Sequence, residues 1–231
     1  MSITILILIA VIAVALAFEF INGFHDCANA IATVVSTKVL SPKQAVLFGA
    51  TLEFAGALTG PHVAKTIGSG IVNADMITLT VIFCALLAAV LWNLFTWWLG
   101  LPSSSSHALI GGLLGAAIVK AGVSVVHIHT LLDKVIIPMF MSPVLGFAVG
   151  FSLMLLIAWV LILLRERPNT VNKQFRKLQL ISSGLMALSH GSNDAQKTMG
   201  IITLALLAAG VLQKSPTGDF DIPVYVIVIC A

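Results

Sequence analysis

Two polar clusters of the same pattern interrupt an otherwise apolar chain. The first is Gly23-Phe24-His25-Asp26-Cys27-Ala28-Asn29, and the second is Gly191-Ser192-Asn193-Asp194-Ala195-Gln196-Lys197. In each cluster an Asp is followed three residues later by Asn or Lys, inside or beside an apolar run of membrane length. An Asp within hydrocarbon is costly unless it is paired, hydrated or bound to an ion. Because this costly feature occurs twice, the sequence predicts a transporter built from two repeats, with its site where the repeats meet.

The composition places the chain in a membrane. Of its 231 residues, 59% are hydrophobic and only 9% are charged, whereas soluble domains carry about 25% charged residues. A soluble domain is therefore excluded, and we expect an all-α polytopic membrane protein. The net charge of +3 gives no reason to expect a nucleic-acid partner. The three cysteines have no metal-ligand spacing, so we expect no disulfide framework, no metal site and no cofactor.

The apolar runs differ in length from simple membrane spans, which need about 20 residues. They fall near residues 3–21, 44–60, 76–99, 108–119, 135–164 and 198–212. Residues 3–37 are too long for one crossing, and residues 108–119 are too short. We therefore expect broken helices and a re-entrant hairpin, with non-helical backbone buried against protein or water. Gly23 and Gly191 are expected to let the helices unwind and expose carbonyl groups.

The positive residues predict an orientation in the membrane. The basic 165–177 segment should be cytoplasmic. No Lys or Arg precedes Lys38, which puts the N-terminus outside, and the loops 61–75 and 121–134 would then face outward. An odd number of crossings before the basic segment inverts the second repeat relative to the first.

The predicted organisation has three parts. A first transmembrane repeat covers residues 1–164, and a basic cytoplasmic loop covers residues 165–177. Residues 178–231 form the start of a second, incomplete transmembrane repeat. The final apolar run, which begins at Pro223, is too short to span a bilayer. We therefore expect the chain to be a C-terminally truncated piece that lacks most of its second repeat and does not transport by itself.

A serine run precedes a short apolar segment at Pro102-Ser103-Ser104-Ser105-Ser106-His107. Ser is a preferred N-cap because its oxygen accepts a free amide N–H, and the residues after it can form a short helix. Free N–H groups, hydroxyls and the positive end of the helix dipole would then meet at one point, which suits an anion such as phosphate. The alternative is a capped loop between two helices. The segment 101–122 could either cross the membrane or re-enter.

Each Asp shares a helix face with the polar residue three positions later, which is Asn29 after Asp26 and Lys197 after Asp194. Carboxylate and amide oxygens suit a small hard cation such as sodium, and a carboxylate near a polyanion can also carry a proton. The alternative is a structural ion pair, for example between Asp26 and Lys197 across the repeat interface. His25 could relay a proton or only form a hydrogen bond at the helix break.

Three further polar residues lie in membrane context. Glu19 and Glu53 occur within apolar runs. They could line the transport pathway or pair with Lys65 or a backbone donor, and the sequence does not separate these possibilities. His107 is expected to fix the serine run rather than to titrate.

Three segments, in the right order, resemble signatures of the inorganic phosphate transporter (PiT) family. Residues 23–30 resemble its first signature and residues 102–107 its Pro-x-Ser-x-x-His hairpin. Residues 190–197 resemble its second signature in the form found in bacterial low-affinity members. The resemblance implies an inverted-repeat fold in the bacterial plasma membrane, commonly a homodimer in the lipid bilayer, that carries phosphate with sodium or protons.

The resemblance also implies roles for individual residues. The set expected to couple a cation or proton comprises Asp26, Asn29, Asp194, Asn193 and His25. The set expected to bind phosphate comprises Ser103, Ser104, Ser105, Ser106, Asn29 and Lys197. Another branch of the family has Ala-Asn in place of Gln196-Lys197. An ammonium there could replace a bound sodium or contact phosphate directly, so we predict proton rather than sodium coupling.

We therefore expect a secondary active transporter that imports inorganic phosphate by symport. An enzyme is not expected: His107 directly follows Ser106, adjacent side chains on a helix diverge, and no Gly-x-Ser-x-Gly motif occurs. A sulfate or other oxyanion permease of the same architecture is the main alternative. Phosphate retains a proton at neutral pH that Asp26 or Asp194 could accept, which favours phosphate over sulfate. Matched motifs at the membrane midplane favour alternating access over a channel.

Overall fold

The computed structural model describes residues 2–59, 71–72, 77–165, 168–213 and 221–231. Its elements in chain order are α1 (Ile3–Ser36), α2 (Pro42–Ala57), α4 (Leu79–Trp98), α5 (Ser105–Ala121), a 3-10 turn (Val123–Val125), α6 (Ile128–Leu131), a π turn (Leu132–Ile136), α7 (Ile137–Leu164), α8 (Pro168–Ala208) and α9 (Val224–Cys230). Within the described residues the extended pairing is limited to one bridge between Val72 and Val126. The predicted all-α class is therefore confirmed. Most of the expected outward loop 61–75, including Lys65, lies outside the described residues.

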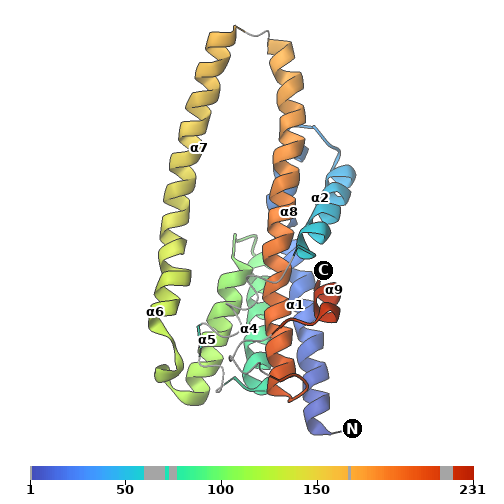
Figure 1. Ribbon diagram of the computed structural model, residues 1–231, viewed down its shortest axis with the longest axis vertical. Coiled ribbons are helices and arrows are strands. Elements are labelled where there is room, and N and C mark those ends of the chain that lie inside the picture. The colour runs from blue at the N-terminus through green and yellow to red at the C-terminus, as the bar shows by residue number, and fades with distance from the viewer. Residues whose placement is uncertain (1, 60–70, 73–76, 166–167, 214–220) are drawn as a thin grey trace.

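The helices are arranged around α1 and α8, which lie side by side and run antiparallel (Figure 1). α2 packs on α8, and α4 packs on both α1 and α5. The core between them is built from fully buried apolar side chains, including Phe18, Ile82, Leu86, Leu109 and Met199. Because α1 and α8 carry the two polar clusters, the clusters enter the interface from opposite directions (Figure 1). That the two segments are inverted repeats stays a prediction.

Three helical segments of the described chain are long and apolar enough to cross a membrane: Ile3–Ser36, Leu79–Trp98 and Ile128–Leu164. α1 alone has 34 residues, a length of about 50 Å that exceeds the hydrocarbon core of a bilayer. The chain is therefore a helical membrane protein, as its composition predicts.

Both polar clusters lie on continuous helices. α1 passes Gly23 and α8 passes Gly191 without a break in helical structure. The predicted unwinding at these glycines is therefore wrong. The backbone groups stay within the helices, and the polar side chains, rather than freed carbonyls, supply the chemistry of the interface.

The glycine of the second cluster serves helix packing instead. A Cβ at Gly191 would overlap the backbone of Glu53, and a Cβ at Gly56 would overlap the backbone of Leu188. Only glycine permits this close approach of two backbones. The two glycines therefore set how closely α2 packs on α8.

α4 and α5 form a helical hairpin whose turn lies beside α1. At its open end, Lys120 Nζ donates to Thr78 Oγ1 at 2.8 Å. Near its turn, the ring of Trp97 meets the ring of Phe24 on α1 edge-on, with centroids 5.5 Å apart. The two helices of the hairpin thus start and end at the same end of the molecule, and its turn lies at the level of the first polar cluster. Whether residues 101–122 cross the membrane or re-enter it stays a prediction.

α7 lies away from the bundle and joins α8 at the far end of the molecule (Figure 1). None of its residues is buried. α8 begins at Pro168, so residues 168–177 of the predicted basic loop are helical instead, because Pro is well suited to a first helical position. Arg176 Nη2 donates to the carbonyl oxygen of Lys38 at 2.8 Å, which places the two basic segments at one end. That this end is cytoplasmic stays a prediction.

Candidate functional site

Three pairs of polar side chains face each other across the α1–α8 interface. The members on α1 are three and four residues apart, and the members on α8 are four residues apart, so each set follows one helix face. The pairs are Glu19 with Thr198, Asn22 with Asp194, and Asp26 with His190. Because the helices are antiparallel, the first residue of one set meets the last residue of the other.

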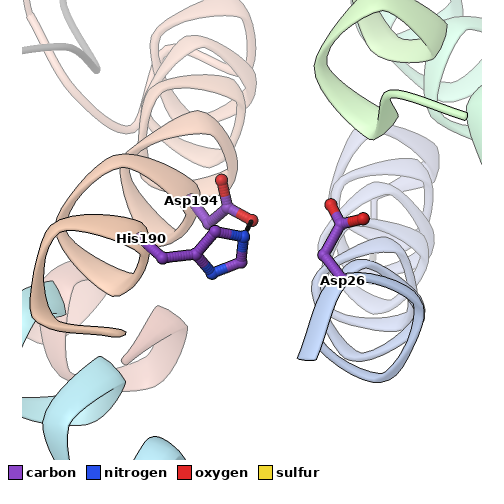
Figure 2. Close-up of side chains that lie close together, drawn as sticks. All are labelled: Asp26, His190 and Asp194. Atoms are coloured by element: carbon purple, nitrogen blue, oxygen red, sulfur yellow. Dashed lines mark ion pairs between the residues drawn. The ribbon is translucent and has the colours of Figure 1, made fainter. Parts of the chain in front are cut away.

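The centre of this interface holds the two aspartates of the matched clusters. Figure 2 shows Asp26 on α1 pointing toward Asp194 and His190 on α8. One ligand atom from each of the three side chains lies within 4.8 Å of the others. The structure therefore brings together the two carboxylates that the sequence pairs by pattern, and adds an imidazole.

Asp194 is surrounded by donors. Lys197 Nζ lies 2.6 Å from its Oδ1, Asn22 Nδ2 donates to its Oδ2 at 3.0 Å, and His190 Nε2 lies 3.4 Å from its Oδ2. The Lys197 side chain is 7% exposed, so this ion pair is largely removed from water. The expected alternative pairing of Lys197 with Asp26 is not observed; the ammonium pairs with the carboxylate on its own helix.

Asp26 has weaker, mostly neutral neighbours. Its Oδ1 lies 3.3 Å from His25 Nδ1 and accepts from Asn29 Nδ2 at 3.5 Å. Its Oδ2 is 3.2 Å from Ser105 Oγ, which donates to it. In the described part of the chain no Lys or Arg pairs with Asp26. Of the two aspartates, Asp194 therefore has an ammonium partner, and Asp26 has none among the described residues.

Asn22 and Ser105 connect the aspartates to the hairpin. Asn22 is 1% exposed and Ser105 is 2% exposed. The Ser105 hydroxyl donates to Asn22 Oδ1, while Asn22 Nδ2 donates to Asp194. A hydroxyl carries a single proton, so Ser105 can serve Asn22 Oδ1 or Asp26 Oδ2 at any one moment. A change in the hydrogen bonding of either aspartate therefore alters the hydrogen bonds of Ser105 in the first turn of α5.

A further acidic residue, Glu53, reaches the site from α2. Glu53 Oε1 lies 3.2 Å from His190 Nδ1, so the imidazole lies between Glu53 and Asp194. Glu19, Glu53, His190 and Asp194 line one cavity of about 590 Å³ between α1, α2 and α8. Both Glu19 and Glu53 therefore line a cavity at the site. That this cavity belongs to the transport pathway stays a prediction, and a pairing with Lys65 lies outside the described residues.

The serine run divides between two places. Ser105 points to the aspartates, whereas Ser103 Oγ accepts from Trp92 Nε1 at 3.1 Å. Ser104 is the N-cap of α5, and its Oγ lies 2.8 Å from His107 Nδ1, so His107 holds the start of the helix. Ser103, Ser104 and His107 line a separate cavity of about 1030 Å³ along α4 and α5.

Two residues of the predicted binding and coupling sets, Asn193 and Ser106, form no side-chain hydrogen bond with Asp26 or Asp194 among the described residues. Asn193 Nδ2 donates to the carbonyl oxygen of Ser189 on its own helix at 2.8 Å, and no described contact joins it to Asp26. Ser106 is partly buried next to Ser105, and its hydroxyl forms no hydrogen bond with another described residue. The predicted core of the site is thus Asp26, Asn29, Asp194, Lys197 and Ser105, with His25 beside it.

Sequence reasoning missed two residues that the structure places at the centre. Asn22 precedes Asp26 by four residues, and His190 precedes Asp194 by four. This shared spacing puts each on the same helix face as its Asp. This spacing could have revealed both residues, because each cluster has a polar residue four positions before its Asp.

Known proteins resemble this chain over most of its length. Residues 22–231 match the family described as the phosphate transporter family. The chain belongs to this family. A Rhizobium meliloti (strain 1021) protein named "Probable low-affinity inorganic phosphate transporter" is 47% identical over 225 residues, which is 97% of this chain and 65% of that protein. A Bacillus subtilis (strain 168) protein of the same name is 46% identical over 235 residues, covering 100% of this chain and 68% of its own length.

A more distant relative and one solved structure also match the chain. PitB of Escherichia coli (strain K12), a low-affinity inorganic phosphate transporter, is 33% identical over 94% of this chain and 50% of its own length. A solved structure titled "The sodium-dependent phosphate transporter" superposes with a TM-score of 0.77 at 23% identity, over 97% of this chain and 72% of that one. At this identity the likeness shows a shared fold. The chain spans half to about two thirds of the length of the curated relatives named above.

Proposed function

We propose that the full-length protein is a multi-pass secondary active transporter of the bacterial plasma membrane that imports inorganic phosphate by symport with protons or sodium. One observation carries the proposal. Asp26 and Asp194 meet at the interface of two antiparallel helices and are linked through Ser105 to the start of α5. A homodimer within the lipid bilayer is part of the proposal, on the strength of the family resemblance.

The charge of the aspartate pair supports coupling to a cation. With Lys197 engaged at Asp194, the carboxylate of Asp26 keeps a negative charge, and like charges repel strongly in a low-dielectric interior. A phosphate that approaches Ser105 meets this charge unless a proton or cation has neutralised it. Cation and phosphate then favour each other's binding, which is the thermodynamic basis of symport.

The hairpin offers the donors for phosphate. α5 begins at Ser105 behind the Ser104 cap, so N–H groups and hydroxyls gather at the positive end of the helix dipole. Ser103, Ser104, Ser105 and Ser106 remain the candidate phosphate ligands. Rocking of one helix group against the other would then expose the loaded site to the opposite side of the membrane.

Lys197 favours protons over sodium as the coupling ion. Its ammonium lies 2.6 Å from Asp194 Oδ1, where it takes the place of a cation at that carboxylate. A bound sodium would have to displace this ammonium. The remaining charge at Asp26 can be neutralised by one proton.

The test is uptake of labelled phosphate by the full-length protein in cells that lack their own phosphate carriers. We expect uptake that survives excess sulfate and sodium removal but collapses with a proton ionophore. Uptake that requires sodium and ignores the ionophore would contradict proton coupling. Competition by sulfate would favour an oxyanion permease of broader range, and no phosphate uptake by a correctly inserted protein would overturn the proposal.

A further inference from the structure

Glu19 is a carboxylic acid of the α1–α8 interface that the proposed mechanism has not used. It lies one turn before Asn22 on the same face of α1, and it lines the cavity shared with Glu53, His190 and Asp194. Its Oε2 accepts a hydrogen bond from the hydroxyl of Thr198 on α8. Thr198 is fully buried, so this contact lies within the packed interface and not at its wet margin.

The partner of Glu19 is neutral. A hydroxyl alone does not compensate an ionised carboxylate inside a membrane helix, where a buried charge needs an opposite charge or a proton. In the described residues no ammonium or guanidinium forms an ion pair with Glu19, because Lys197 is engaged at Asp194. Glu19 in this arrangement therefore suits a protonated acid.

The titratable groups near Glu19 come from three helices, α8, α9 and α2. Asp194, Lys197 and His190 on α8 act on it electrostatically, and Cys230 on α9 and Glu53 on α2 line the same cavity. Lys197 and Thr198 are neighbours in sequence, but Lys197 forms an ion pair with Asp194 and Thr198 donates a hydrogen bond to Glu19. One turn of α8 thus connects the two acids.

We propose that Glu19 binds a coupling proton and exchanges it through the cavity between α1, α2 and α8, in concert with the Asp194–Lys197 pair. While Lys197 is held by Asp194, the acid form of Glu19 is favoured. When Asp194 is neutralised, the Lys197 ammonium is free to turn toward Glu19. The O–H bond of Glu19 then breaks, its proton passes to water in the cavity, and the carboxylate that remains pairs with the ammonium.

This inference rests on the proposed phosphate transport, so its test must separate the two. The full-length protein is reconstituted in liposomes and assayed in two ways. The first assay is exchange of labelled phosphate at equal pH on both sides, which needs no net proton movement. The second is net uptake at fixed external pH with an alkaline interior, which does.

The decisive variant is Glu19→Gln, which keeps the shape of the side chain and its bond to Thr198 but cannot release a proton. We expect the rate of phosphate exchange to stay within about twofold of the wild-type rate. The stimulation of net uptake by the pH gradient should be about tenfold smaller than in the wild type. Asp133→Asn is the matched control, because Asp133 is exposed on the π turn and its change should alter neither assay.

Each outcome has one meaning. A Glu19→Gln protein that still responds to the pH gradient overturns the role of Glu19 and leaves phosphate transport standing. Loss of both assays at normal protein levels also overturns it, since Glu19 would then serve substrate binding or structure. A wild type without phosphate exchange defeats the proposed function and this inference together. Thr198→Val provides a second check: it should shift the internal pH at which stimulation is half-maximal while preserving the stimulation.

Discussion

Asn22 on α1 donates through Nδ2 to Asp194 Oδ2 on α8 at 3.0 Å. Through Oδ1 the same amide accepts from Ser105, so one buried side chain connects both matched helices and the hairpin. The amide therefore holds Asp194 in register with Asp26, which lies one turn further along α1.

We predict that Asn22→Ala lowers the free energy of unfolding by about 1–3 kcal/mol more than Asn93→Ala, because two made hydrogen bonds are lost. Asn93 is the matched control. It is also fully buried in a helix, but both polar atoms of its amide lack partners among the described residues. Thermal unfolding in detergent measures both variants, and equal destabilisation would show that the Asn22 bonds contribute little.

The two aspartates should differ in their structural cost. Asp26→Asn and Asp194→Asn are both expected to abolish coupled phosphate uptake. Asp194→Asn also leaves the buried Lys197 ammonium without its ion-pair partner, which costs about 3–5 kcal/mol. The combined change Asp194→Asn with Lys197→Met should restore stability but not uptake. Membrane protein levels, unfolding temperature and uptake are measured together, and an unstable combined variant would contradict this account.

Neighbouring serines should separate into different roles. Ser105→Ala removes the donor to Asn22 and Asp26, so we expect a higher KM for phosphate and weaker dependence of uptake on the coupling ion. Ser104→Ala removes the N-cap of α5, which costs about 1 kcal/mol of stability, and it should raise KM while leaving the coupling ratio unchanged. Phosphate uptake over a range of external pH distinguishes the two, and identical profiles would contradict the division.

Gly191 should be intolerant of any side chain. Gly191→Ala places a Cβ against the backbone of Glu53, and forced separation of α2 from α8 should cost about 1–3 kcal/mol. Gly146 on α7 has nothing within 4 Å of its Cβ position, so Gly146→Ala should be neutral or stabilising by up to about 1 kcal/mol. Unfolding temperature of the two variants is the measurement, and the reverse order would show that α2 and α8 pack differently.

Local pattern was sufficient for part of the site. The matched Asp clusters predicted that Asp26 and Asp194 would meet, and the spacing of three predicted that Asn29 and Lys197 would lie beside them. The serine run predicted a capped helix start at the hairpin, which Ser104 provides. The first inference depends on the match between two clusters of the chain, and the others depend only on helical periodicity or on a signal within a few residues.

Other features depended on contacts between distant segments. Glycine at 191 was expected to unwind α8, because the sequence shows its conformational freedom but not the α2 backbone against which it packs. The imidazole of His190 was overlooked, because its partner Glu53 comes from another helix. Lys197 was free to pair with either aspartate until the helix positions decided for Asp194.

By itself the sequence determined that the chain is a helical membrane protein, where its polar clusters lie, and which residues share a helix face, because composition and a period of 3.6 residues act locally. Only the tertiary structure decided which faces meet. The antiparallel packing of α1 and α8 aligns Glu19 with Thr198 and Asn22 with Asp194. That alignment comes from close backbone approach and core packing between residues far apart in the chain. A periodic pattern within one helix carries no information about such contacts.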